Sequence, residues 1–134
     1  MPSRFDPGAL LGRFYPLEDG SRVHLRVARP SDAAPIRELF ARQGGREGLA
    51  APEFEAARLV NFNPRERCVL TATALVDGAE RMVGVGSIEL DGDPRSDPEP
   101  ELVVVDPDAP EGLGPLLAGA LAGRAGALAR DRAA

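Results

Sequence analysis

Apolar and polar positions alternate over residues 23–28, and this period of two predicts a half-buried strand. Residues 68–76 and 81–90 are rich in β-branched and apolar side chains. The pair Asp77-Gly78 between them is a hairpin signal. We therefore expect these two segments to form strands that pair antiparallel.

Helical spacing of apolar residues follows the first strand. Ser31 or Asp32 can cap a helix whose first turn contains Pro35, where a missing N–H costs little. The pair Gly44-Gly45 would end this helix. Its apolar stripe consists of Ala33, Ile36, Leu39 and Phe40.

Three further segments complete the pattern. A second helix is expected over residues 52–61, because Ala56, Leu59 and Val60 lie on one side of it. The pair Asn63-Pro64 then breaks the helical pattern. Residues 101–105 read as a strand that follows an acidic, proline-rich connection over residues 91–100. A final helix then presents one apolar face formed by Leu117, Leu121, Ala125 and Leu128.

This order of elements predicts a mixed α/β fold, and the 134 residues are enough for one domain. Residues 1–20 combine aromatic and aliphatic side chains with glycine and proline. We expect them to pack on the core as an irregular arm. The whole of residues 1–134 is therefore interpreted as a single domain.

Charge and composition narrow the function. The net charge is −5 and the acidic residues are scattered, which argues against a nucleic-acid partner. The single Cys68 cannot form an internal disulfide, and no apolar run is long enough to span a bilayer. The first residues lack the apolar centre of a signal peptide. We therefore expect a cytoplasmic protein without a membrane partner.

The last third carries the main chemical signal. A strand at residues 101–105 leads through a turn with Gly112 and Gly114 into a helix. This arrangement directs backbone N–H groups and the positive end of a helix dipole at one point, which suits a phosphate group. Turn glycines before helices are common, so the signal gains weight only from its context.

That context resembles the GCN5-related N-acetyltransferase (GNAT) family. The resemblance covers roughly residues 15–130, and details of its N-terminal half are similar to the branch that acetylates lysines on bacterial proteins. It is carried by the segments Tyr15-Pro16, Asp19-Gly20, 23–26, 29–32, 63–67, 83–85, 101–105 and 112–114.

The resemblance implies an acetyl-CoA-dependent N-acetyltransferase that modifies an amine such as a protein lysine. It also implies a mostly antiparallel sheet flanked by helices. A strand-borne glutamate often serves as the base in this family, because an ammonium group must lose its proton before it can attack a thioester. Carried over by position, Glu101 becomes the candidate base, Val103, Val104 and Val105 would contact pantetheine, and Gly112, Leu113 and Gly114 would hold the pyrophosphate.

The chain departs from the family pattern in two ways. The turn has Ala109 where the family has glutamine or arginine, and Pro110 and Pro115 have no N–H to donate. The sequence also stops after the helix, so the resemblance implies a fold truncated behind the cofactor-binding helix. The strand at residues 101–105 would then be an open edge, which predicts a homodimer. The alternative function is a degenerate, non-catalytic GNAT-like dimerisation or partner-binding module.

The remaining candidates have simple structural alternatives. Glu101 could be only a solvated strand-end carboxylate, and Glu89 is a second candidate base. Gly84 and Gly86 point to the same face of a strand, where they could let another backbone or a ligand come close. The alternative is a β-bulge or a tight helix contact.

Metal binding and cysteine chemistry are not expected. Asp91-Gly92-Asp93 does not match a calcium loop, so no metal site is predicted. His24 is interpreted as a strand-surface residue and Cys68 as a small core residue.

Overall fold

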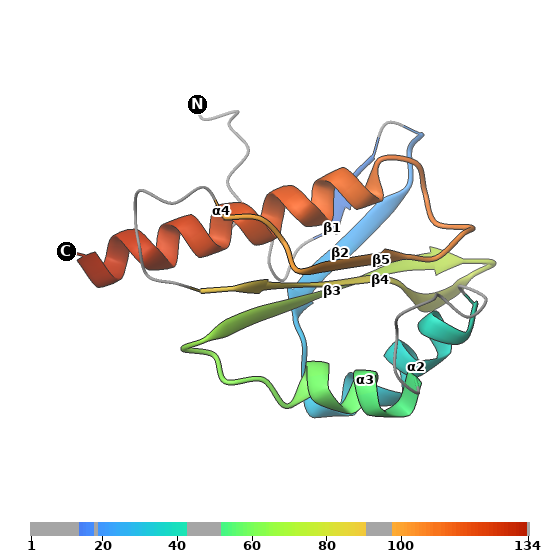
Figure 1. Cartoon of the computed structure of the whole chain (residues 1–134). Helices are drawn as coiled ribbons and strands as arrows, with labels where there is room; N and C mark the ends of the chain where they lie inside the picture. Colours follow the sequence, from blue (N-terminus) through green and yellow to red (C-terminus); the bar gives the residue numbers. More distant parts are fainter. Residues whose placement is uncertain (1–13, 18, 43–51, 91–97, 134) are drawn as a thin grey trace.

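The computed structural model describes residues 14–17, 19–42, 52–90 and 98–133 (Figure 1). Over this part of the chain, five strands form one antiparallel sheet in the order β1-β2-β3-β4-β5, accompanied by three α-helices. The predicted mixed α/β class is therefore confirmed. Strand order in the sheet equals strand order in the chain, so each strand pairs with its sequence neighbours.

The element boundaries lie close to those predicted. The strands are β1 (Phe14–Pro16), β2 (Arg22–Val27), β3 (Arg67–Val76), β4 (Ala79–Glu89) and β5 (Leu102–Val105). The helices are a 3-10 turn η1 (Pro30–Asp32), followed by α2 (Ala33–Arg42), α3 (Pro52–Val60) and α4 (Leu113–Ala133).

The β3–β4 hairpin turns at the predicted position. Asp77 and Gly78 both have positive φ angles, 52° and 82°, and Val76 pairs with Ala79 across the turn. Two consecutive positive φ values are what a two-residue turn needs to match the twist of its strands. The hairpin prediction is confirmed.

Helices cover both faces of the sheet (Figure 1). The helix α4 packs over one face, chiefly on β4 and β3, and α2 packs against the other face together with α3. The core on the α4 side includes Val23, Leu25, Leu70, Val83, Ile88, Leu117 and Leu121. The core on the other side includes Ile36, Leu39, Phe40, Leu59, Val69, Val85 and Val104.

The start of the α2 region is held by a charged pair. Arg26 donates two hydrogen bonds to the Asp32 carboxylate, at 2.7 and 2.6 Å, and the Arg29 N–H donates a third at 2.7 Å. Burial raises the pKa of Asp32, but these donors outweigh it and hold the pKa below its ordinary value. Asp32 therefore links β2 to the helix that follows it.

The N-terminal arm differs from its prediction in one part. Residues 14–16 form the short strand β1, which pairs antiparallel with β2, where an irregular chain was expected. Three residues that include Pro16 are too few for an alternating pattern to be visible in the sequence. Residues 1–13 and 18 lie outside the described residues, as do Gly44-Gly45 and Asp91-Gly92-Asp93.

Candidate functional site

The strand β5 lies at one edge of the described sheet, beside β4. Val104 is buried in the core on the α2 side, whereas Val103 and Val105 are partly buried against the α4 side. The three valines predicted to contact pantetheine therefore point alternately to the two faces of the sheet.

Their backbone groups also alternate. The Asp106 N–H donates to the Val83 carbonyl at 2.9 Å, which makes these residues a hydrogen-bonded antiparallel pair. Two residues earlier, Val104 must likewise direct its backbone groups toward β4. The backbone groups of Val103 and Val105 are directed to the other side of β5. Val104, one of the three predicted residues, therefore cannot pair with a ligand along the edge.

The glycines of β4 serve helix packing. A Cβ atom at Gly86 would lie 2.6 Å from Leu121 Cδ1, and one at Gly84 would lie 3.3 Å from Leu113 Cδ2. Both positions face α4 and allow the helix to lie close to the sheet. The structure shows the tight helix contact at both glycines, and the register of β3 and β4 also shifts beside Gly84, as expected for the bulge alternative.

The predicted glycine turn does lie at the start of α4. Gly112 has a φ angle of 92°, and its carbonyl accepts the first helical hydrogen bond from the Leu116 N–H at 3.2 Å. The Leu113 N–H already donates to the Pro110 carbonyl at 3.3 Å, and the Leu113 side chain is fully buried. Pro115 has no N–H. The amides of Gly112 and Gly114 are the donors that remain at this helix start.

Asp106 anchors the turn, and sequence reasoning missed it. This buried carboxylate accepts hydrogen bonds from Arg42 Nε, from Arg81 at 2.8 Å and from the Asp108 N–H at 2.8 Å. Burial raises the pKa of Asp106, but these three donors outweigh it and hold the pKa below its ordinary value. The aspartate directly after the strand was a local signal for a turn, but its arginine partners were not visible in the sequence.

Arg42 extends this anchor across the fold. Besides its contact with Asp106, it donates a hydrogen bond to the Met82 carbonyl at 2.9 Å. The end of α2 is therefore tied both to β4 and to the turn that leads into α4. We call the group formed by Arg42, Arg81 and Asp106 the Asp106 cluster.

The predicted base Glu101 is engaged in an ion pair. Arg67 donates two hydrogen bonds to the Glu101 carboxylate, at 2.7 and 3.0 Å. The hydrogen bonding by Arg67 lowers the pKa of Glu101, and desolvation opposes this only in part. A lower pKa makes a carboxylate a weaker base, by about 1.4 kcal/mol for each pKa unit.

The second candidate base lies beside the same arginine. Glu89, at the exposed end of β4, is the register partner of Arg67 on β3. Both candidate bases are therefore gathered around one guanidinium group. Both glutamates can therefore be explained as exposed partners of Arg67 where the strands β3 and β4 end.

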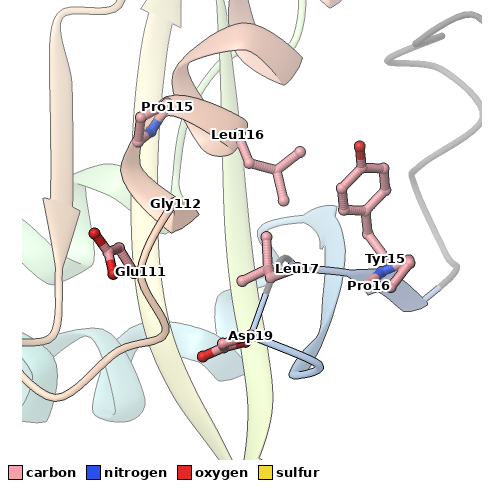
Figure 2. A pocket seen from close by; sticks show the side chains of 8 residues that line it. All are labelled: Tyr15, Pro16, Leu17, Asp19, Glu111, Gly112, Pro115 and Leu116. Atoms are coloured by element: carbon pink, nitrogen blue, oxygen red, sulfur yellow. The ribbon is translucent and has the colours of Figure 1, made fainter.

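A hollow of about 820 Å³ opens beside the start of α4 (Figure 2). Residues from β1, from the turn after it and from the first turn of α4 line this space, which we call the α4 hollow. None of its described lining residues is basic, and two of them are acidic. They are Tyr15, Pro16, Leu17, Asp19, Glu111, Gly112, Pro115 and Leu116.

The α4 hollow therefore fits a diphosphate poorly. Gly112 lines it, but the carboxylates of Asp19 and Glu111, which also line it, would repel a bound phosphate. A hydrogen bond from the Ser21 N–H lowers the pKa of Asp19, so this carboxyl is charged at neutral pH. The electrostatics of this space oppose the pyrophosphate-binding role that the resemblance assigns to Gly112.

Cys68 is buried at the start of β3, as predicted for a small core residue. Burial raises the pKa of its thiol, and Arg124 offsets this only in part. A thiol with a raised pKa is a poor nucleophile at neutral pH.

Two further properties hold for the described residues. None of their histidine, cysteine, aspartate and glutamate side chains form a group of three that could hold a metal ion. None of the described helices has the length and apolar character needed to cross a bilayer.

Comparisons of the chain with models of protein families, with curated proteins and with solved structures found no match.

Proposed function

We propose that the chain is a non-catalytic, GNAT-like domain that binds a partner. The observation that carries this proposal is the acidic lining of the α4 hollow beside Gly112, one of the three residues to which the resemblance assigns the pyrophosphate. In addition, two of the backbone donors expected at this helix start are unavailable, because Leu113 is bonded and Pro115 has no N–H. Each missing charge-assisted donor costs about 1.5–3 kcal/mol of binding, or roughly tenfold to a hundredfold in affinity.

The state of Glu101 supports the same proposal. Its carboxylate is held by two hydrogen bonds from Arg67, and its lowered pKa opposes a role in taking a proton from an ammonium group. A base in the second candidate reaction would have to leave this ion pair before it could act.

Acetyl transfer to an amine such as a protein lysine is the second candidate function. It is favoured by the order in which β5 leads through a glycine turn into α4, and by the backbone groups of Val103, which point away from β4. In that case acetyl-CoA would be the cosubstrate and Glu101 the base.

One assay separates the two functions. The protein is titrated with acetyl-CoA by calorimetry, and thiol release is followed with a panel of amines and lysine peptides. We expect no saturable binding at millimolar acetyl-CoA and no thiol above the spontaneous rate. Thiol release that requires an amine and is lost in Glu101→Gln would establish the acetyltransferase and refute the proposal.

A further inference from the structure

We propose that the α4 hollow is a binding site for an organic cation, an ammonium group on an apolar stem. This assignment names a ligand class for the proposed binding function, and in that sense rests on it. The evidence, however, comes from the hollow itself, which none of the GNAT-derived assignments explains.

One end of the hollow is acidic. In Figure 2 the carboxylates of Asp19 and Glu111 lie toward one end, and they come from two separate segments, the turn before β2 and the turn before α4. The Ser21 N–H holds Asp19 in place through a 2.8 Å hydrogen bond. No described residue forms an ion pair with Glu111.

The rest of the lining is apolar. In Figure 2 the side chains of Leu17 and Leu116 lie between the acidic end and the ring of Tyr15. Leu116 is almost fully buried, while Tyr15 and Leu17 are partly buried and pack against the core on the α4 side. An alkyl stem lying over these three side chains would remove apolar surface from water.

The balance of charges around the hollow determines whether it favours a positive or a negative ligand. The start of α4 contributes the positive end of a helix dipole, equivalent to about half an elementary charge. Two carboxylates exceed this contribution, so the field in the hollow favours a cation.

The lining also decides between a metal ion and an organic cation. Calcium takes six to eight oxygen ligands, and magnesium needs an octahedral set of oxygens. Most of the described lining residues here present leucine, proline or aromatic carbon rather than oxygen. An organic ammonium group can use two carboxylates and an apolar wall at the same time, which a bare metal ion cannot.

The site can be tested by NMR titration of the intact chain with n-hexylammonium. The amide signals of Leu17, Gly112 and Leu116 are expected to shift in a saturable way. The neutral n-hexanol and the anionic heptanoate have the same six-carbon stem and are expected to shift these signals much less. Equal shifts with n-hexanol, or shifts produced by inorganic pyrophosphate at the same residues, would overturn the proposal.

A matched pair of double variants tests the role of the charges. Asp19→Asn with Glu111→Gln is expected to weaken n-hexylammonium binding about threefold to tenfold, since each exposed charge pair contributes modestly. Glu38→Gln with Glu99→Gln removes the same net charge from exposed positions outside the hollow, and should leave the affinity unchanged. An equal loss of n-hexylammonium affinity in both double variants would show that only the net charge of the protein matters, and would refute the site.

The failure of this inference is distinguishable from the failure of the proposed function. Turnover of acetyl-CoA would refute the proposal of a non-catalytic domain, but it would not change the outcome of the n-hexylammonium titration. An absence of saturable shifts would refute the cation site and leave the acetyl-CoA result as it stands.

Discussion

Asp106 is a buried carboxylate that forms ion pairs with two arginines. Its two arginine partners come from α2 and from β4, and its own backbone belongs to the turn after β5. Removing a carboxylate from such a group leaves guanidinium groups without their counterion, which costs more than the pair itself contributes. The carboxylate therefore matters through the positive charges that it neutralises.

Asp106→Asn is expected to lower the free energy of unfolding by about 1–3 kcal/mol, because two partly buried arginines lose their charged partner. Urea unfolding at neutral pH measures the change. Glu101→Gln is the control, since its exposed pair with Arg67 should contribute less than about 1 kcal/mol. Equal effects of the two substitutions would contradict the importance assigned to burial.

Acid is expected to destabilise the protein. The pKa values of Asp32, Asp106 and Glu101 all lie below their ordinary values in the folded state. The unfolded chain therefore binds more protons in acid, and stability is lost as pH falls through the ordinary aspartate value of about 3.9 toward the folded pKa values.

Urea unfolding at several pH values checks this expectation. The contribution of these carboxylates should be constant between pH 7 and 5 and should decline below about pH 4. Asp106→Asn should show a shallower decline, because one of the three groups is absent. Stability that rises on acidification would show that other groups dominate.

The packing of α4 on β4 depends on the absence of a side chain at Gly86. A Cβ there would lie 2.6 Å from Leu121 and 3.0 Å from the Leu102 carbonyl oxygen. Leu121 is fully buried, so its side chain has little room to move. Gly86 therefore limits the separation between this helix and the sheet more tightly than Gly84 does.

Gly86→Ala is expected to lower the free energy of unfolding by about 1–3 kcal/mol through overpacking. Gly114→Ala is the matched control, because its Cβ would meet Val105 at an ordinary distance of 3.8 Å. Thermal and urea unfolding measure both variants. The proposed contact would be wrong if Gly86→Ala were as stable as the unsubstituted protein.

The elements could be predicted where local patterns are strong. Alternation located β2, the Asp77-Gly78 pair located the β3–β4 turn, and helical spacing gave the buried face of α4. The strand β1 was missed, because its pairing with β2 provides what its three residues cannot signal alone. Local sequence patterns therefore predicted the long elements, but not the short strand β1 at the edge of the sheet.

The candidate site was less predictable, because its properties depend on distant residues. The glycine turn was found at the start of α4, but Arg42 and Asp106 are 64 positions apart, and Arg67 and Glu101 are 34 apart. Neither ion pair leaves a pattern in the sequence. Whether a carboxylate can act as a base depends on such partners, and so the role of Glu101 could not be read from its position.

At the scale of the whole molecule, β5 forms one edge of the described sheet. Val103 directs its backbone groups away from β4, and edge strands with such groups are templates for pairing with another chain. Two copies of β5 could pair antiparallel about a twofold axis, which would satisfy the same groups in both copies. This geometry gives the proposed partner-binding function one specific form, a homodimer.

Sedimentation velocity at micromolar concentration is expected to show this dimer. Val103→Pro removes an N–H directed away from β4, so it should shift the protein to monomer while the β4–β5 pairing persists. A thermal melt serves as the folding control. A monomer before substitution, or a dimer that tolerates Val103→Pro, would exclude pairing through β5.

The sequential order of the strands has a consequence during synthesis. All five strands leave the ribosome before α4 does, because α4 follows them in the chain. The apolar face that contains Leu25, Leu70 and Ile88 therefore lacks the cover of α4 until this helix has emerged. Slow translation of the codons for α4 would lengthen the time in which chaperones or aggregation compete for that surface.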